Sequence, residues 1–524
     1  MPVWRTFRFA SGVFLGRHFR AEEKVPPAAG GSTAMSHPNH LTRRRFLAGM
    51  AAASTVWIVP ARAFGANERP QIGMVGLGGR GKAHIKWVMD SGGEVVGVYD
   101  PDKSHMDGAT FKDKEGKVLT FKPYPDLRKL LEEKSIDAVV MATPNHWHAL
   151  GTIWACQAGK DVYVEKPACH SIWEGRKMVE AARKYKRIVQ VGTQQRSDPA
   201  FIETRQLLEK KELGEIQWTH SLWYEDRGSI GKTTTPTPVP DTIDYDAWCG
   251  PRPKVPLMRK KLHYDWHWIR DYGNGDMGNR VIHVIDDIHH VLQMNGDVPT
   301  RMMAVGGRFK YDDDANTPNS EFIVMQWKFP IVFSSQNLPN IDAKTGKPAG
   351  SAVYRRFGKG HRFTNLIKCE KGFFAVSRGG GALFDNDGNR IRQIKGDGGG
   401  NHMKNFFDAM RSRRHEDLRA DVEQSYLGCL LLHTGDISCM IGKPASVDEV
   451  SKAVEGTEEG REVWKQTVEL LKANGVDPNV EKPTLGPLLT FDPKTEKFTG
   501  DFADEANKRV REEYREPYTI PDRV

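Results

Sequence analysis

The segment QIGMVGLGGRG at residues 71–81 decides the fold. Its apolar first half predicts a short strand, and Gly76, Gly78 and Gly81 give the spacing G-x-G-x-x-G immediately before a helical pattern. In this arrangement the first glycine permits a tight turn and the second lets the backbone approach a pyrophosphate. The third lets the helix pack closely on the sheet. The segment therefore predicts a dinucleotide site at a helix N-terminus.

An acidic residue at the end of the next predicted strand favours one dinucleotide over another. Residues 94–100 form that strand and end on Asp100. A carboxylate in this place accepts hydrogen bonds from the adenosine ribose hydroxyls and repels a 2′-phosphate. Arg80 can contact a phosphate, which weakens this preference slightly. We therefore expect NAD rather than NADP.

The pattern around this segment predicts an α/β fold with two domains. Residues 70–192 alternate strand and helix patterns, which is typical of a Rossmann domain with a doubly wound parallel sheet. Residues 193–445 predict an α+β domain with a large, mostly antiparallel, open sheet. Its expected strands lie at 215–224, 301–309 and 321–337. Its expected flanking helices lie near 280–294 and 402–413. Residues 228–242 read as a loop, and 446–524 as a C-terminal extension with helices near 457–473 and 503–514.

The first 63 residues predict a leader and signal peptide. A twin-arginine pattern at 42–47 is followed by an apolar stretch to Val59 and by Ala61-Arg62-Ala63, an A-x-A cleavage site. We expect export by the twin-arginine machinery to the periplasm or beyond, with cleavage near Ala63. Met35 is an alternative start to Met1.

Composition and charge argue against a nucleic-acid-binding, membrane-spanning or metal-binding protein. The leader holds nine basic and two acidic residues, so it accounts for most of the net charge of +9 and the rest carries about +2. We therefore expect no nucleic-acid surface. No run of 18 apolar residues predicts a membrane span. The six cysteines form no C-x-x-C pair, so we expect packed thiols and no bound metal.

Three further motifs follow later strands of the predicted sheet: TPNHWH at 143–148, EKP at 165–167 and VGTQQR at 191–196. With the glycine loop, this set resembles the Gfo/Idh/MocA family, named for glucose–fructose oxidoreductase and inositol dehydrogenase. The resemblance covers about residues 70–445. It implies that Lys166 is the catalytic lysine and that Pro167 follows a cis bond. It implies cofactor contacts for Thr143, Pro144, Asn145, His148, Glu165 and Gln194.

The second domain adds GNGDMGN at 273–279, followed by His283 and Asp286. Many family members carry Asp four residues before this histidine, but this chain has Asn279. Asparagine binds a hydroxyl but does not titrate, so we expect acid/base chemistry at Lys166 and His283, with Asn279 on the same helix face. Asp286 either hydrogen-bonds His283 or has a structural role. Burial, His283 and a cationic nicotinamide are expected to lower the lysine pKa from about 10.4 towards roughly 7–8.

Aromatic residues just before the loop at 273–279 predict either a wall of the substrate pocket or, equally, ordinary packing in the hydrophobic core. The candidates are Tyr264, Trp266, His267 and Arg270. The resemblance implies hydride transfer between nicotinamide and a sugar, polyol or glycoside carbon. The motifs do not separate this from a redox-neutral glycosidase or lyase acting through a transient 3-keto sugar, and a non-catalytic carbohydrate or nucleotide binder is a third reading.

Two further expectations follow. Export away from the nicotinamide pool predicts tightly bound NAD. The resemblance and an open sheet face predict a homo-dimer or homo-tetramer.

Overall fold

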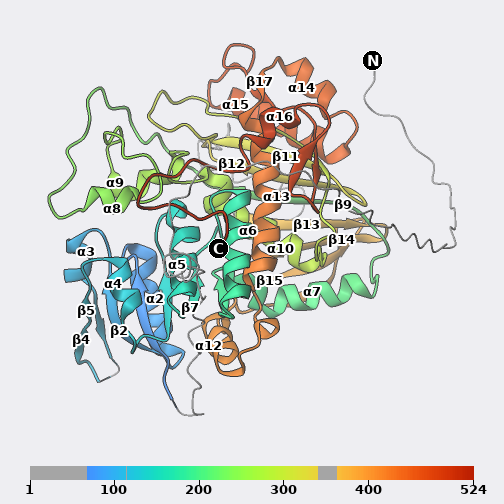
Figure 1. Ribbon diagram of the computed structural model, residues 1–524. Coiled ribbons are helices and arrows are strands. Elements are labelled where there is room, and N and C mark those ends of the chain that lie inside the picture. Colours follow the sequence, from blue (N-terminus) through green and yellow to red (C-terminus); the bar gives the residue numbers. More distant parts are fainter. Residues whose placement is uncertain (1–67, 114, 340–362) are drawn as a thin grey trace, which may run out of the picture. The chain divides into compact units, whose positions relative to one another are not determined.

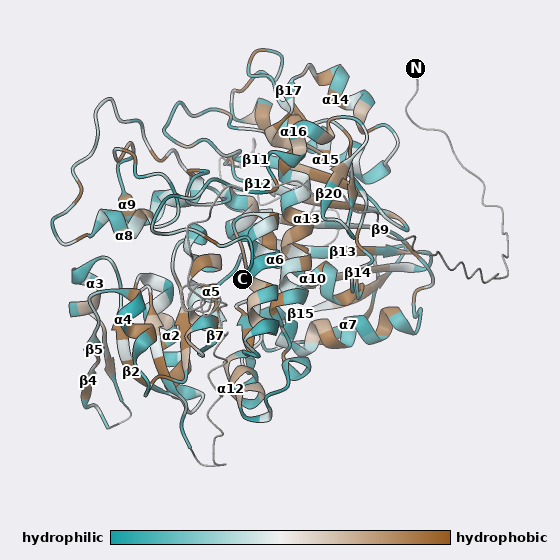
Figure 2. Ribbon diagram, viewed as in Figure 1, coloured by the Kyte–Doolittle hydropathy of each residue, from teal (hydrophilic) through white to brown (hydrophobic). Residues whose placement is uncertain are grey.

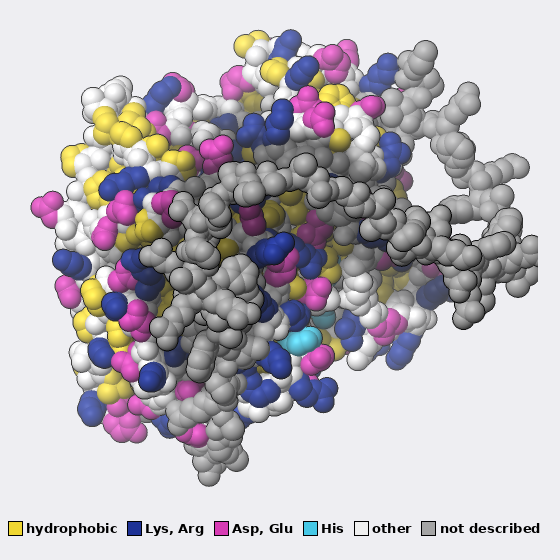
Figure 3. Space-filling model, in the orientation of Figure 1, with side chains coloured by type: hydrophobic (Ala, Val, Ile, Leu, Met, Phe, Trp, Pro, Cys, Tyr) yellow, Lys and Arg dark blue, Asp and Glu magenta, His cyan; other side chains and the backbone are white. Residues whose placement is uncertain are grey.

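The computed structural model describes residues 68–113, 115–339 and 363–524, all within the unit Val59–Val524 (Figure 1). The predicted leader, with its twin-arginine motif and cleavage site, lies outside these residues. No helix among them has the length and apolar character needed to cross a membrane. The six cysteines are buried and free, as expected. On the face in Figure 3, basic and acidic side chains are interspersed.

A six-stranded parallel sheet forms the N-terminal domain and confirms the predicted Rossmann fold. Its strand order is β5-β2-β1-β6-β7-β8. The strands are β1 Gln71–Val75, β2 Glu94–Tyr99, β5 Lys122–Pro123, β6 Ala138–Met141, β7 Asp161–Val164 and β8 Val189–Val191. A small hairpin, β3 Thr110–Lys112 and β4 Val118–Thr120, and the short helix α3 Lys103–Asp107 lie between β2 and β5 in sequence.

Apolar residues alternate between the two faces of this sheet. In β6, Val139 and Met141 face a cluster with α4 Leu127–Glu132, α5 His148–Gln157 and α6 Ile172–Lys184. Val140 faces the opposite cluster, which contains α2 Gly79–Asp90 and α12 His402–Ser412. The placement of α12 corrects the sequence interpretation, which put this helix beside the second sheet. Phe406 and Phe407 of α12 are fully buried against the parallel strands instead.

The second domain is built on a twelve-stranded sheet. Its strands are antiparallel except for β9, which pairs parallel with β12. The predicted strand at 321–337 is a hairpin, because residues 327–329 turn the chain between β11 and β12. The strands are β9 Ile216–Tyr224, β10 Arg301–Gly307, β11 Ser320–Gln326, β12 Pro330–Gln336, β13 Phe363–Cys369, β14 Gly372–Ser377, β15 Gly380–Asp385, β16 Arg390–Lys395, β17 Lys443–Pro444, β18 Thr484–Leu485, β19 Leu489–Asp492 and β20 Lys497–Thr499.

Helices cover one face of this sheet. They are α7 Pro199–Glu209, α10 Ile282–Val291 and α13 Val422–Met440, and α13 packs against both α6 and α10 (Figure 1). Helix α7 carries hydrophilic and hydrophobic residues on different sides (Figure 2) and buries Phe201 and Leu207. Two short helices, α8 Tyr245–Cys249 and α9 Leu262–Asp265, interrupt the segment that follows β9, and residues 228–242 form the predicted loop.

The C-terminal extension packs on both domains. Helices α14 Val447–Ala453 and α15 Glu458–Ala473 bury Val450 and Trp464 against the outer face of β10–β12. This part of the sheet face, expected to be open, is therefore covered by the same chain. The predicted helix at 503–514 is shorter, α16 Ala503–Asn507. Beyond it the chain returns to the N-terminal domain, where Glu512 lies 2.8 Å from Nδ1 of His170.

Candidate functional site

A cavity of about 560 Å³ lies where the carboxyl ends of β1, β2, β6 and β7 meet the second domain. Ligands of open α/β sheets bind at this edge, because the loops after the strands converge there. The N-terminal domain contributes Val75, Gly76, Gly78, Gly79, Arg80, Ala83, Tyr99, Asp100, Pro101, His105, Leu127, Ala142, Thr143, Pro144, Asn145, Trp147, Glu165 and Lys166. The second domain contributes Ala247, Trp248, His263, Tyr264, Trp266, His267, Asn279 and Arg280.

The glycine loop has the geometry that a pyrophosphate requires. Gly76 has a φ of +82°, and a Cβ at Gly81 would lie 2.0 Å from the Gly76 carbonyl oxygen, so loop and helix pack without side chains. Gly78 lines the cavity, and a Cβ there would meet no protein atom within 4 Å. Helix α2 begins at Gly79 and has no acidic residue in its first turn, so its free N–H groups favour an anion.

Asp100 is held rigidly at the end of β2. Its Oδ2 accepts the backbone N–H of Leu77 at 2.6 Å and its Oδ1 accepts that of Asp102 at 2.9 Å. Nδ1 of His105 lies 3.2 Å from Oδ2. The carboxylate lines the cavity next to the glycine loop, where an adenosine ribose would lie. The residues present at this end therefore fit NAD.

The loop after β6 brings three of its four predicted residues to the cavity. Thr143, Pro144 and Asn145 line it, and Nδ2 of Asn145 donates to Asn274 at 3.1 Å. His148 does not line it. The His148 ring is buried, with its nitrogens 2.7 Å from the carbonyl of Pro167 and 3.0 Å from that of Thr143. It therefore positions the loops after β6 and β7, and the Lys166-Pro167 bond in the second of these loops is cis, as expected.

Glu165 lines the cavity as a buried carboxylate. Burial acts to raise its pKa, but the hydrogen bond from Nε2 of His84 at 2.8 Å and the positive charge of Arg80 hold the pKa well below its usual range. Gln194 does not line the cavity. Its Nε2 donates to the hydroxyl of Tyr163 at 3.1 Å and lies 3.4 Å from Oε1 of Glu165, so it helps to position that carboxylate. His84 was missed in the sequence. A histidine on the buried face of α2 was the available signal.

Lys166 places its amine at the cavity wall. Nζ donates to the backbone oxygen of Asn279 at 2.7 Å and lies 3.4 Å from its Oδ1. Burial lowers the lysine pKa to about 8, Glu165 acts in the opposite direction, and the Arg80 and Arg280 charges add to the lowering. The amine therefore exchanges a proton in the range in which acid/base catalysis operates.

Asn279 lies in the π-helical turn Met277–Val281, which precedes α10. Its side-chain Nδ2 is buried and has no hydrogen-bond partner among the described residues. His283, one turn later, does not line the cavity and stacks on Trp223 with ring centroids 6.0 Å apart. Burial and the Lys166 charge keep the His283 pKa well below its usual range, so its ring is neutral.

Two predicted site residues hold ion pairs elsewhere. Asp286 accepts both Nε and Nη2 of the buried Arg196, at 2.7 and 2.8 Å, so it neither contacts the cavity nor orients His283. Arg270 pairs with Asp436 on α13 at 2.9 and 3.2 Å and is likewise outside the lining. Their roles are structural, since a buried charge needs a partner.

The aromatic segment forms part of the second-domain wall. Tyr264, Trp266 and His267 line the cavity, and the Trp266 and His267 rings stack with centroids 3.7 Å apart. Burial lowers the His267 pKa to about 3, so this ring is neutral too. Arg280, missed in the sequence, follows Asn279 directly and adds a positive charge beside Lys166.

Comparison with known proteins agrees with this geometry. Residues 71–193 match the oxidoreductase family GFO_IDH_MocA, NAD-binding Rossmann fold, and residues 218–329 match its C-terminal alpha/beta domain. The chain is similar to inositol 2-dehydrogenase of Salmonella paratyphi B, with 26% identity over 38% of this chain and 56% of the relative. It is similar to the NAD(+)-dependent scyllo-inositol 2-dehydrogenase of Bacillus subtilis, with 32% identity over 27% of this chain and 40% of the relative.

These alignments span about half the length of the curated relatives. Among solved structures, the WlbA dehydrogenase of Bordetella pertussis, in complex with NADH and UDP-GlcNAcA, has a TM-score of 0.50 at 17% identity. That match covers 70% of this chain and 94% of the other and shows a shared fold. Residues 71–193 and 218–329 are therefore similar to the NAD-binding Rossmann domain and the C-terminal alpha/beta domain of the Gfo/Idh/MocA oxidoreductase family.

Proposed function

We propose that this protein transfers hydride between NAD and a hydroxyl-bearing carbon of a sugar, polyol or glycoside, with Lys166 as the acid/base. The observation that carries the proposal is the Lys166 amine. It lies at the wall of the dinucleotide cavity, is fixed by Asn279 at 2.7 Å, and has its pKa lowered to about 8. Bound NAD would supply the hydride acceptor at C4 of its nicotinamide.

Lys166 handles the proton of this reaction. In the oxidation direction the neutral amine takes the hydroxyl proton as the C–H hydrogen leaves as hydride. In the reduction direction the ammonium form returns a proton to the developing alkoxide. With a pKa of about 8, both forms are present near neutral pH, so one residue serves both directions.

Neighbouring groups fit a substrate with several hydroxyls. Nδ2 of Asn279, next to the lysine, has no hydrogen-bond partner among the described residues, and the neutral His267 ring lines the same cavity with Tyr264 and Trp266. Aromatic faces next to single polar donors are typical of binding sites for polyhydroxylated ligands. The names of the inositol dehydrogenase relatives support the same class of substrate.

The test uses purified protein without the leader. Nucleotide released by denaturation is identified first, and the protein is then assayed with inositols, free sugars and aryl glycosides while NADH absorbance and aglycone release are recorded. Net NADH from a free polyol or sugar supports the proposal. Aglycone release without NADH assigns the redox-neutral lyase or glycosidase instead. Released nucleotide with neither reaction across the panel would leave the non-catalytic binder as the better account.

We further propose that the protein is exported by the twin-arginine route with NAD already tightly bound. The support is the sequence at 42–47 and 61–63. Replacing Arg43 and Arg44 together by lysine should keep the protein in the cytoplasm, whereas the unaltered chain should reach the periplasm with Phe64 at its N-terminus. Periplasmic recovery of the double-lysine variant would contradict this route.

A further inference from the structure

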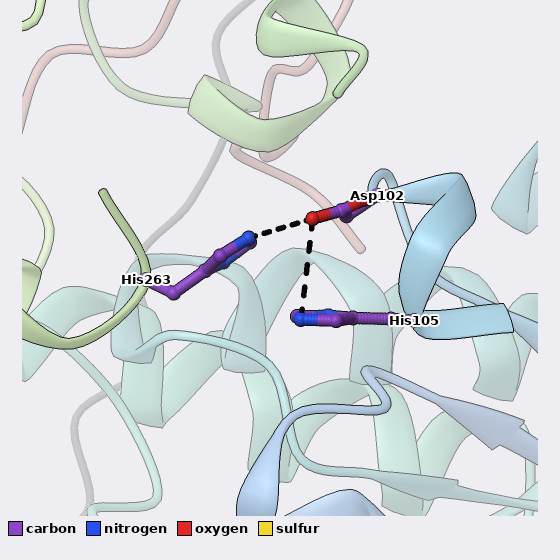
Figure 4. Close-up of side chains that lie close together, drawn as sticks. All are labelled: Asp102, His105 and His263. Atoms are coloured by element: carbon purple, nitrogen blue, oxygen red, sulfur yellow. Dashed lines mark hydrogen bonds and ion pairs between the residues drawn. The ribbon is translucent and has the colours of Figure 1, made fainter. Parts of the chain in front are cut away.

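We propose that Asp102, His105 and His263 form a site for a zinc-type divalent metal ion at the edge of the cofactor cavity (Figure 4). Asp102 and His105 come from the start of α3 in the N-terminal domain, and His263 comes from α9 in the second domain. One potential ligand atom from each residue lies within 4.8 Å of the other two. Two imidazoles and one carboxylate are a ligand set that zinc accepts.

The spacing of these atoms suits one small ion. Oδ2 of Asp102 lies 2.8 Å from Nε2 of His263 and 4.0 Å from Nε2 of His105. Zinc bonds of about 2.0–2.2 Å in a tetrahedron place ligand atoms about 3.3–3.6 Å apart. The two separations fall on either side of that range. The third separation, between the two histidine ligand atoms, is within 4.8 Å, so modest rotations of the two rings bring all three atoms to bonding distance of one ion.

The groups behind the ligands already orient them. Nδ1 of His105 faces Oδ2 of Asp100 at 3.2 Å, so it carries the ring proton and leaves the Nε2 lone pair towards Asp102. Oδ1 of Asp102 accepts the backbone N–H and the hydroxyl of Ser104, at 2.9 and 2.7 Å, so Oδ2 remains directed at the histidines. A carboxylate behind a ligating histidine and donors behind a ligating carboxylate are usual supports of metal sites.

Charge and access also favour a cation. Asp100 and Asp102 bring carboxylate oxygens to within 2.8–4.0 Å of the ring nitrogens, whereas the lysines nearby, Lys82, Lys260 and Lys261, are exposed. The His263 side chain is 39% exposed and that of His105 is 22% exposed. An ion can therefore enter from solvent, and a water molecule can complete a four-coordinate shell.

Such an ion would fasten the wall of the cofactor cavity. The segment between β9 and α9 already crosses the end of β2, where the N–H of Lys103 donates to Thr242 and that of Asp244 to Pro101, both at 2.9 Å. His105 and His263 both line the cavity on the side of Asp100, where the adenosine half of NAD would lie. A metal bridge between them ties the two domains over that half and slows release of the cofactor.

The test measures metal directly, so it does not depend on the proposed reaction. Protein freed of metal by a chelator is incubated with zinc chloride and desalted, and bound zinc per chain is measured. About one tightly bound ion is expected for the unaltered chain. His105→Ala and His263→Gln should each bind zinc at least about tenfold more weakly. The glutamine keeps a donor facing Asp102, so the ordinary hydrogen bond survives while the imidazole ligand is lost.

His415→Ala is the matched control. His415 is an exposed histidine whose Nε2 lies 3.4 Å from Glu416, and it belongs to no three-ligand group among the described residues. It should bind zinc like the unaltered chain. Equal zinc binding by the unaltered, His105→Ala and His263→Gln proteins would overturn the site. Slower NAD release with zinc than with chelator supports the bridge, and equal release rates would overturn that role alone.

Discussion

Replacing Asn279 by aspartate should raise the pKa of Lys166 and move the pH dependence of alcohol oxidation. The substitution places a carboxylate oxygen near the present Oδ1, which lies 3.4 Å from Nζ of Lys166. It keeps the size of the side chain and introduces the acid that the resemblance to the Gfo/Idh/MocA family implies at this position. A negative charge at this distance stabilises the ammonium form, so the neutral base appears only at higher pH.

The magnitude follows from that distance. At 3.4 Å and an effective dielectric constant of about 20, two unit charges attract by about 5 kcal/mol. Desolvation of the new carboxylate reduces the net effect, and an opposite charge this close shifts a pKa by about 1–3 units, or about 1.4–4 kcal/mol. From a starting pKa of about 8, the variant lysine should titrate between about 9 and 11.

The assay is kcat/KM for oxidation of the best substrate across the pH range 6–11. For the unaltered chain the rate should rise with pH and level off above the lysine pKa of about 8. For Asn279→Asp the rise should move up by at least about one unit, which lowers the rate at pH 8 roughly fivefold or more. Rates should converge at high pH. An unshifted profile with a uniformly lower rate would refute the assignment of this titration to Lys166.

Asn386→Asp is the matched control. Oδ1 of Asn386 accepts Nζ of Lys368 at an exposed position, so the same substitution beside a lysine is made outside the cavity lining. Its pH profile should equal that of the unaltered chain. A shift in both variants would trace the effect to net charge rather than to the contact with Lys166.

Three further substitutions test the cavity and its support. Asp100→Asn should raise affinity for NADP relative to NAD by about tenfold in fluorescence titrations, because it removes a negative charge beside the ribose, and an unchanged ratio would contradict that role. Gly81→Ala places a Cβ 2.0 Å from the oxygen of Gly76 and should cost about 1–3 kcal/mol in chemical unfolding; a neutral result would refute the close packing. Arg196→Met leaves Asp286 buried without its partner and should cost about 3–5 kcal/mol, whereas an unchanged unfolding midpoint would show the pair to be dispensable.

The glycine loop and the strand pattern were enough to predict the Rossmann domain, because each predicted feature is local in sequence. The alternation of strand and helix patterns indicated the parallel sheet, and the motif after each apolar run located most of the cavity lining. Loops at the carboxyl ends of parallel strands must converge, so motifs far apart in sequence become neighbours.

Predictions that depended on long-range packing were less accurate. The amphipathic helix α12 has no sequence mark that assigns it to one sheet, and it packs on the parallel sheet from more than 200 residues away. Asp286 and Arg270 looked like site residues because they lie near the second-domain motif. In the structure Asp286 forms an ion pair with Arg196, and Arg270 forms one with Asp436. The three residues of the proposed metal site escaped notice because His263 is far in sequence from Asp102 and His105.

The most direct test of the central claim is turnover by Lys166→Ala with and without an added small amine. The lysine Nζ lies at the cavity wall, so its removal should lower kcat by about 10²–10⁴ while NAD binding is retained. Ethylamine should restore part of the rate, in proportion to the fraction of amine that is unprotonated. Full activity of Lys166→Ala without any amine would contradict the account.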